Sequence, residues 1–289
     1  MSIETQDIEY AVRDGISLLA RMHKPTGPGP FPLVIELHGG TWMTGDRHTD
    51  ALLNDALAQR GVMVASLDFR MPPTAAYPAS MQDINSAVRW FRKNAARLGV
   101  MPDRIGLLGT SSGGHQAIIC AMGSRSGPYA APVQAGLDDI DPDSNFAVLA
   151  YTVIDPASRY QHFLTRKDEP GRPPIIDIVL AGHAAYWKDP AALAEASPLR
   201  ILQEQPDLQL PPVLYCQADG DVSHPLGDAQ RFVEAYKRRG GQLEYFPFAA
   251  TGTAPPPPGM RYASTLDRLE EPERSRFYDG IAAFIHNLK

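Results

Sequence analysis

The feature that most constrains the fold of this chain is a serine between a predicted strand and a predicted helix. Residues 109–113 read Gly-Thr-Ser-Ser-Gly, a G-x-S-x-G motif centred on Ser111. The preceding segment Arg104–Leu108 is typical of a short buried strand, and Gln116–Met122 is an apolar run compatible with a helix. A serine at such a strained turn projects its hydroxyl out of the sheet, and the glycines permit close backbone packing. Ser111 is therefore a candidate nucleophile, although this motif also occurs by chance.

A second motif lies about seventy residues upstream. The run Pro32–Leu37 is strand-like, and it ends in the sequence His-Gly-Gly-Thr-Trp at residues 38–42. Acyl transfer needs N–H donors fixed where negative charge develops, and glycines let the backbone present them. We predict that the amides of Gly40, Thr41 and Ser112 form this oxyanion hole. Alone, the tripeptide is also compatible with an ordinary turn, but two such motifs behind separate strands favour acyl-transfer chemistry.

Strand-like and helix-like segments alternate along the chain. Residues 8–24 are expected to form a hairpin that turns at Asp14-Gly15, and Ala79–Leu98 carries one apolar stripe of helical period. The predicted parallel strands are Leu33–Leu37, Val62–Asp68, Ile105–Gly109, Phe146–Ala150, Val213–Cys216 and Leu243–Phe248. This alternation predicts an α/β fold with a doubly wound, mostly parallel sheet covered on both faces.

Several further segments carry a resemblance to a known family. They are Leu-Asp-Phe-Arg at 67–70, Tyr-Pro-Ala at 77–79, Asp83, residues 87–91 and 102–105, Ser-Pro at 197–198 and residues 211–214. Together with the two motifs above, they resemble bacterial esterases of the α/β-hydrolase superfamily, in the hormone-sensitive-lipase and feruloyl-esterase-like branch. The resemblance covers most of the chain. It implies the α/β-hydrolase fold and ester hydrolysis by a Ser-His-Asp triad, without a metal or an organic cofactor.

The chain departs from this family at the histidine. In the family the histidine follows the last strand, here Leu243–Phe248, within a few residues. This chain continues with residues 249–254 and then four prolines, Pro255–Pro258, and no histidine occurs between His224 and His286. The usual base is therefore absent.

The acid loop offers a substitute base. Residues 216–225 resemble the family's acid loop, with Asp221 at the catalytic aspartate and His224 where a valine normally packs beside the triad histidine. We infer that His224 accepts the Ser111 proton while Asp221 orients its other nitrogen, with Asp219 as the second choice for the acid. The alternative is that His224 only precedes a helix and has no chemical role.

An irregular interval at about 124–196 interrupts the alternation, and inserts at this stage form a lid or pocket wall in the family. Trp42 and the aromatic run containing His183, Tyr186 and Trp187 are the predicted substrate pocket, although these rings could equally pack the lid onto the core. His183 is also the next base to consider. His115 is expected to be a hydrogen-bonded packing residue, and His38 to bond nearby backbone.

Bulk properties favour one catalytic domain spanning residues 1–289. The net charge of −6 does not favour nucleic acid or an anionic membrane as a partner. The start of the chain shows no secretory signal, and the two cysteines suit reduced thiols, so we expect a cytoplasmic protein. No histidine pair has metal-ligand spacing, so no metal is expected.

These features favour a serine carboxylic-ester hydrolase with an atypical triad and a small-molecule ester as substrate. The alternatives are a ligand-binding pseudohydrolase, by analogy with plant gibberellin receptors that lack a working histidine, and an amide or lactone hydrolase. The fold does not separate these functions. A homodimer is the other association considered.

Overall fold

The computed structural model describes residues 3–123, 125, 127–132, 136–249, 266 and 269–288. An eight-stranded sheet runs through it in the order β1-β2-β4-β3-β5-β6-β7-β8. The strands are β1 (Glu4–Arg13), β2 (Ile16–Lys24), β3 (Phe31–Leu37), β4 (Met63–Leu67), β5 (Val100–Thr110), β6 (Ala147–Ala150), β7 (Val213–Ala218) and β8 (Leu243–Phe248). From β4 to β8 all pairs are parallel, whereas β1, β2 and β4 pair antiparallel. The predicted α/β fold with a mostly parallel sheet is confirmed.

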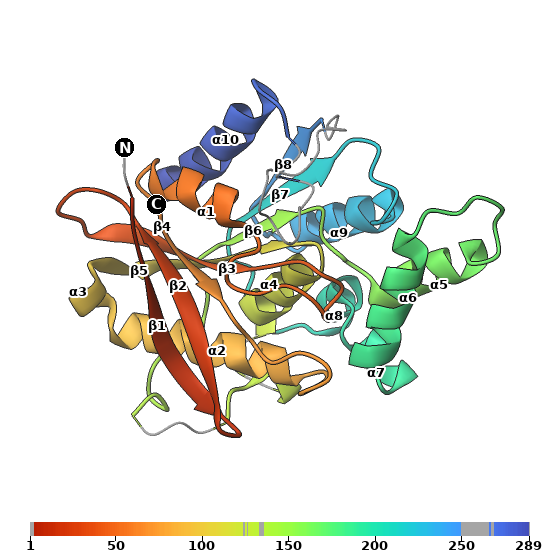
Figure 1. Ribbon diagram of the computed structural model, residues 1–289, viewed down its shortest axis with the longest axis horizontal. Coiled ribbons are helices and arrows are strands. Elements are labelled where there is room, and N and C mark those ends of the chain that lie inside the picture. Colours follow the sequence, from red (N-terminus) through yellow and green to blue (C-terminus); the bar gives the residue numbers. More distant parts are fainter. Residues whose placement is uncertain are drawn as a thin grey trace.

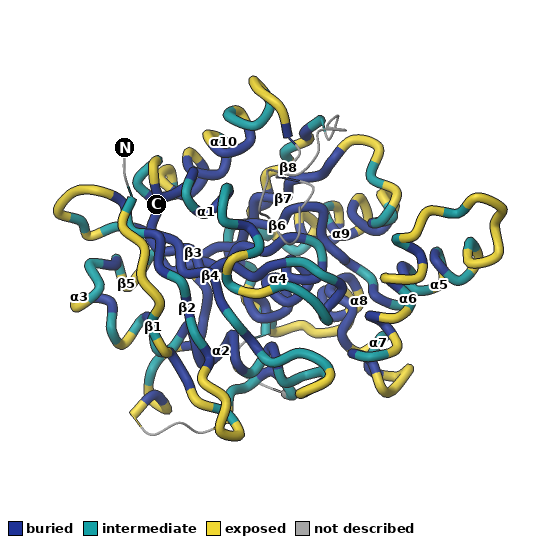
Figure 2. Tube along the Cα trace, viewed as in Figure 1, coloured by how far each residue is buried: buried dark blue, intermediate teal, exposed yellow. Residues whose placement is uncertain are grey.

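Helices cover both faces of this sheet (Figure 1). On one face lie α1 (Ala51–Ala58) and α10 (Glu273–Asn287), whose apolar residues share a core cluster with β3, β4, β6 and β7. The other face is covered by α2 (Ala79–Lys93), α4 (Ser112–Gly123), α8 (Pro198–Glu204) and α9 (Leu226–Arg238). Figure 2 shows the central strands of the sheet buried between these two layers, whereas the edge strand β1 is largely exposed. The central strands are therefore apolar on both sides, as their continuous hydrophobic runs predicted.

The predicted helix over Ala79–Leu98 is interrupted. The structure ends α2 at Lys93 and begins the short α3 (Ala95–Leu98) after Asn94. The Trp90 carbonyl accepts hydrogen bonds from both the Asn94 amide at 3.1 Å and the Asn94 side chain at 2.8 Å, and side chains that bond to the backbone in this way disfavour helix interiors. Helical period alone could not locate this break.

Three further helices lie at one end of the sheet and not on its faces (Figure 1). They are α5 (Pro156–Arg166), α6 (Ile175–Tyr186) and α7 (Pro190–Glu195), and we call them the α5–α7 segment. The side chains of Asp155 and Asp189 cap α5 and α7, each just before a proline at the first helical position. An aspartate followed by proline satisfies free N–H groups and preorganises the first turn, so the local sequence determines where both helices begin.

A short 3₁₀ turn at Gly127–Tyr129 completes the elements. Within the described part of the chain, no helix is long and apolar enough to span a bilayer.

Candidate active site

Ser111 occupies a strained turn between β5 and α4. Its φ is 52°, in the left-handed region that non-glycine residues rarely adopt. A Cβ on Gly109 would lie 2.3 Å from the carbonyl carbon of Gly113, and one on Gly113 would lie 1.9 Å from the carbonyl oxygen of Leu37. Only glycine fits at both positions. The G-x-S-x-G spacing therefore follows from the packing of the turn against β3 and α4, as the sequence predicted.

The hydroxyl of Ser111 meets His224. Ser111 Oγ lies 2.9 Å from His224 Nε2, across a sequence separation of 113 residues. Ser111 is half-buried, whereas His224 is only 7% exposed. The structure thus brings together the predicted nucleophile and the predicted substitute base.

Asp221 holds the other side of the imidazole. Its Oδ2 lies 2.7 Å from His224 Nδ1, while its Oδ1 accepts hydrogen bonds from the amides of Ser223 and His224 at 2.8 and 3.1 Å. With Nδ1–H donating to this carboxylate, Nε2 is left as the acceptor for the Ser111 hydroxyl. Asp219 is exposed, and its amide donates to the carbonyl of Phe248. The structure places Asp221, and not Asp219, against the histidine.

The charges of the acid loop favour a neutral base and an ionised acid. Burial lowers the pKa of His224 and outweighs the Asp221 carboxylate, which acts in the opposite direction, while the positive charge of Arg159 lowers it further. Burial raises the pKa of Asp221, but His224 and the two backbone hydrogen bonds more than offset it, so the net shift is downward. A neutral imidazole beside an ionised carboxylate can accept a proton from Ser111.

The predicted oxyanion turn has an unusual backbone. Gly40, Thr41 and Trp42 have φ values of 117°, 53° and 59°. A Cβ on Gly40 would lie 2.1 Å from the Thr44 carbonyl oxygen, so this position requires glycine. In the described part of the chain, the amides of Gly40, Thr41 and Ser112 donate to no backbone or side-chain acceptor outside regular elements. Free donors of this kind, one at the start of α4 and two in the turn after β3, can stabilise a developing oxyanion.

The two motifs are tied together directly. The amide of Trp42 donates to Ser112 Oγ at 3.2 Å. On its other side, the oxyanion turn packs against α6, where a Cβ on Gly182 would lie 2.6 Å from Thr41 O. The sequence did not predict the contact with Gly182, because a glycine inside a helix does not indicate which backbone segment packs against it.

Trp42 is the centre of an aromatic cluster. Its ring stacks on Tyr186 with centroids 5.6 Å apart and meets His183 and Trp187 edge to face at 5.0 and 5.3 Å. Tyr186 is fully buried, and its hydroxyl is 2.7 Å from Ser80 Oγ. Of the four predicted pocket residues, the structure therefore places Trp42 and Tyr186 in the packed core. His183 and Trp187 are part of this cluster and also face a cavity.

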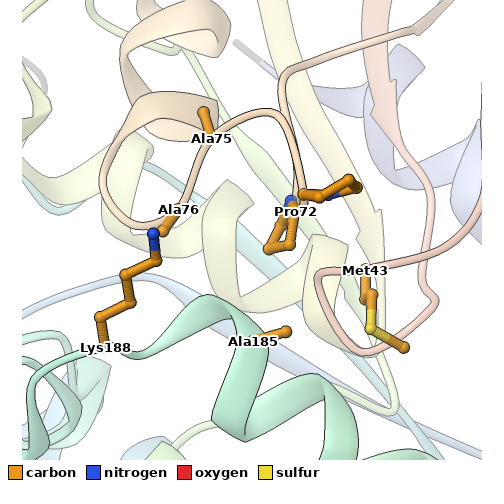
Figure 3. A pocket seen from close by; sticks show the side chains of 7 residues that line it. Met43, Pro72, Ala75, Ala76, Ala185 and Lys188 are labelled. Carbon is orange, nitrogen blue, oxygen red and sulfur yellow. The ribbon is translucent and has the colours of Figure 1, made fainter.

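Two described cavities flank α6. One of about 280 Å³ is lined by His183, Trp187, Ala157, Tyr160, Gln161, Ala184, Pro190 and Leu193. The other, of about 370 Å³, is mostly apolar and has Lys188 at its wall (Figure 3). Its remaining lining residues are Met43, Pro72, Pro73, Ala75, Ala76 and Ala185. Met43 follows the oxyanion turn, whereas Ser111 and His224 are not among the residues that line either of these two cavities.

The other histidines near the site have structural partners. His115 Nε2 donates to the carbonyl of Ala196 at 2.8 Å, and its Nδ1 accepts from Trp42 Nε1 at 3.3 Å. Burial lowers the pKa of His115 to about 4, which keeps it neutral. His38 Nδ1 donates to the carbonyl of Gly39 at 2.8 Å. Both expectations from the sequence, a packing role for His115 and a backbone contact for His38, are confirmed.

Sequence reasoning missed Arg159 on α5. Its side chain is buried beside the acid loop, and its Nε donates to the carbonyl of Ser223 at 2.9 Å. No motif marks this arginine, because the contact joins a helix of the α5–α7 segment to a loop more than sixty residues later.

Within the described residues, no group of three His, Cys, Asp or Glu side chains is arranged to hold a metal ion. The segment at 250–258, where the family histidine was expected, lies outside the described residues. The contacts of His224 with Ser111 and Asp221 involve no residue of that segment.

Comparisons with known proteins agree with this architecture. A family model described as BD-FAE matches residues 22–235. The versiconal hemiacetal acetate esterase of Dothistroma septosporum is 27% identical over 241 residues, covering 82% of this chain and 70% of that protein. The carboxylic ester hydrolase LipN of Mycobacterium tuberculosis is 34% identical over 113 residues, which are 38% of this chain but only 30% of LipN.

Solved structures show the same fold. A Thermogutta terrifontis esterase with butyrate bound aligns over 98% of this chain and 93% of its own, with a TM-score of 0.71 and 22% identity. The same organism's esterase 2 phosphonylated by sarin aligns over 85% of this chain and 83% of its own, with a TM-score of 0.67 and 24% identity.

Proposed function

The chain belongs to the BD-FAE family of α/β-hydrolase esterases, and from this membership and the geometry at Ser111 we propose that it hydrolyses small-molecule carboxylic esters through an acyl-enzyme. The observation that carries the proposal is the 2.9 Å contact between Ser111 Oγ and His224 Nε2. Two similar proteins are themselves named as an esterase and a carboxylic ester hydrolase, which supports the reaction class.

Acylation begins at the serine hydroxyl. Ser111 Oγ attacks the ester carbonyl carbon as its proton passes to His224 Nε2, and the Asp221 carboxylate stabilises the resulting imidazolium. The amides of Gly40, Thr41 and Ser112 receive the negative oxygen of the tetrahedral intermediate. The imidazolium then returns its proton to the leaving alkoxide as the carbon–oxygen bond breaks, which leaves the acyl group on Ser111.

Deacylation repeats these steps with water. His224 removes a proton from a water molecule, whose oxygen attacks the acyl carbonyl, and the proton returns to Ser111 Oγ as the acid departs. A chain without a working base would stop at the acyl-enzyme. In this proposal, His224 on the acid loop therefore makes the chain a hydrolase and not a ligand-binding protein.

We assign the α5–α7 segment the role of a lid in a single domain. Its α6 packs on the oxyanion turn through Gly182, and His183 and Trp187 line the 280 Å³ cavity. An apolar cavity of this kind suits a short acyl or alcohol group, with the cavity beside Met43 available to the other half of the ester.

The test is covalent labelling. Incubation with a fluorophosphonate, followed by mass spectrometry, is expected to modify the peptide containing Ser111, and p-nitrophenyl acetate is expected to be turned over. Ser111→Ala should lose both signals, whereas Ser223→Ala on the acid loop should keep them. Intact ester turnover in Ser111→Ala would refute the proposal. Labelling of the wild type without turnover would instead support a ligand-binding protein or a stalled acyl-enzyme.

A further inference from the structure

Arg159 is a buried cation beside the proposed base. Its side chain is only 2% exposed, and its Nε donates to the carbonyl of Ser223, the residue before His224. In the described part of the chain, the Nη1 of this guanidinium has no hydrogen-bond partner, and its interaction with the Asp221 carboxylate is electrostatic without a hydrogen bond. Burial of this arginine costs free energy, and the Asp221 carboxylate offsets part of that cost electrostatically without forming an ion-pair contact.

The guanidinium also reaches the oxyanion side of the site. The Arg159 Cζ lies 5.9 Å from the ring centroid of Trp42, and the Trp42 amide donates to Ser112 Oγ. Phe163, one turn further along α5, places its ring 5.5 Å from the same Cζ. One side chain of α5 therefore contacts both the loop that carries His224 and the turn next to the nucleophile.

The neighbouring residue strengthens the attachment of α5. Ser158 Oγ donates to Asp228 Oδ1 at 3.1 Å, in the first turn of α9 just after the acid loop. Two successive residues of α5 thus bond to the acid loop and to the helix that follows it. Asp221 holds its beginning through the amides of Ser223 and His224.

We infer that Arg159 is a positioning residue for the proposed relay: it holds the acid loop in the conformation in which the His224 imidazole faces Ser111. This inference rests on the proposed function. A base on the acid loop needs this support, because the backbone of the loop carries both the acid and the base. Any shift of the loop therefore displaces both of them from Ser111. A displacement of about 1 Å at a reacting group can cost about a hundredfold in rate.

The charge of Arg159 has a second effect on the same histidine. The groups that face His224 are the Asp221 carboxylate, the Ser111 hydroxyl, the Tyr151 ring at 5.7 Å and the Arg159 guanidinium. Among them, the carboxylate raises the pKa of His224 and the guanidinium lowers it. Burial lowers the pKa of Arg159 itself to about 10, so it remains charged at neutral pH. Arg159 therefore opposes the imidazolium that Asp221 favours.

Three substitutions separate the two effects. Arg159→Met removes both the hydrogen bond to Ser223 and the charge. Arg159→Gln keeps a donor for that carbonyl but has no charge, and Arg159→Lys keeps the charge on a side chain without the planar donor geometry. Arg166→Met is the matched control, because Arg166 lies on the same helix and pairs with exposed Glu169.

The kinetic experiment measures kcat, KM and the pH profile of kcat/KM with p-nitrophenyl acetate. We expect Arg159→Met to lower kcat about tenfold or more with a smaller change in KM. In Arg159→Met and Arg159→Gln the acid limb of the profile should move to higher pH, because the loss of a nearby cation raises the pKa of His224. Arg159→Lys should leave the limb near its wild-type position, and Arg166→Met should change neither kcat nor the limb.

An NMR titration of the histidine ring signals, with the His224 signal assigned from His224→Ala, measures the same shift without activity. Wild-type kcat in folded Arg159→Met would overturn the positioning inference, and an unchanged His224 midpoint in folded Arg159→Gln would overturn the effect of the charge. Should Arg159→Met fail to fold, the Gln and Lys variants decide the question. Failure of Ser111 labelling in the wild type would instead refute the proposed function, and the titration would still report the effect of Arg159.

Discussion

His224 Nδ1 lies 2.7 Å from Asp221 Oδ2, and the two residues are only three positions apart on one loop. The proposed base and its orienting acid therefore come from the same segment, and their separation is maintained by the hydrogen bonds of that loop to its own backbone. The nucleophile, in contrast, reaches them from the opposite side, on the turn after β5. Several expected outcomes depend on this arrangement.

The first prediction concerns the base. His224→Ala should lower ester turnover by about 10³-fold or more, because the serine then has no proton acceptor and only the oxyanion hole and binding remain. Steady-state kinetics with p-nitrophenyl acetate measures this loss. His286→Ala is the control, since His286 Nε2 only bonds the carbonyl of Arg60 at the surface. Near-wild-type turnover in folded His224→Ala would exclude this relay and make His183 the next base to examine.

The second prediction separates the two aspartates of the acid loop. Asp221→Asn should reduce kcat by at least about a hundredfold, because the amide no longer stabilises the imidazolium or selects the tautomer with Nδ1–H. Asp219→Asn should have little effect, since Asp219 is exposed and its carboxylate is not bonded to His224. The comparison of kcat values, with circular dichroism to check folding, decides between them. A larger loss for Asp219→Asn would reverse the assignment.

The third prediction is the pH dependence of the wild-type enzyme. Only neutral His224 can accept the serine proton, and burial with Arg159 lowers its pKa below the ordinary value of 6.5. Activity should therefore be fully present at neutral pH and fall only as the pH drops through a midpoint below 6.5. Profiles of kcat/KM in constant-ionic-strength buffers test this. A midpoint clearly above 6.5 would contradict the charge arrangement described for the acid loop.

The fourth prediction concerns the cavity of the α5–α7 segment. Tyr160 is half-buried, lines the 280 Å³ cavity and stacks on His183 at 5.2 Å. Tyr160→Ala should enlarge the cavity and shift the preference in kcat/KM toward longer acyl chains, by about tenfold or more per added group that fits. A series of p-nitrophenyl esters from acetate to octanoate measures the shift. Trp90→Ala, on α2 and not among the residues that line this cavity, should leave the preference unchanged, and an unchanged series in Tyr160→Ala would exclude this cavity as the acyl site.

The fifth prediction concerns a buried carboxyl behind the oxyanion turn. Glu36 is 1% exposed, and Asn54 Nδ2 donates to its Oε2 at 3.3 Å. Burial first, and then the neighbouring Asp50, hold the pKa of Glu36 well above its usual range. Because the folded state keeps this proton when the unfolded state has lost it, stability should decrease as the pH rises above about 4.5.

Glu36→Gln removes that dependence. Its melting temperature should exceed that of the wild type at pH 8, by about 2 °C or more, and the difference should shrink toward pH 4. Differential scanning calorimetry at both pH values measures it. Glu234→Gln, on the exposed face of α9, serves as the control. A Glu36→Gln protein that is less stable than the wild type at pH 8 would mean that the carboxyl is ionised and paired in the fold.

The sequence alone predicted the elements whose signals are local. Alternating apolar segments indicated the strands, and the hairpin turn at Asp14-Gly15 forms where it was expected. The elbow at Ser111 was recognisable because its glycines are required by packing within a few residues. The sequence also shows that no histidine lies between His224 and His286, so no histidine closely follows β8 and His224 was the predicted substitute base.

Only the tertiary structure decided which of these residues meet. The contact between Ser111 and His224 spans 113 positions, and its distance is set by the sheet order that places β5 two strands from β7. Whether Asp221 or Asp219 lies against His224 depended on which carboxylate points toward the site. The burial of Tyr186 depended on its contacts with Trp42 and Ser80. Arg159 had no local signal at all. Periodicity and turn chemistry act over a few residues, whereas a site is assembled by packing between segments far apart in the chain.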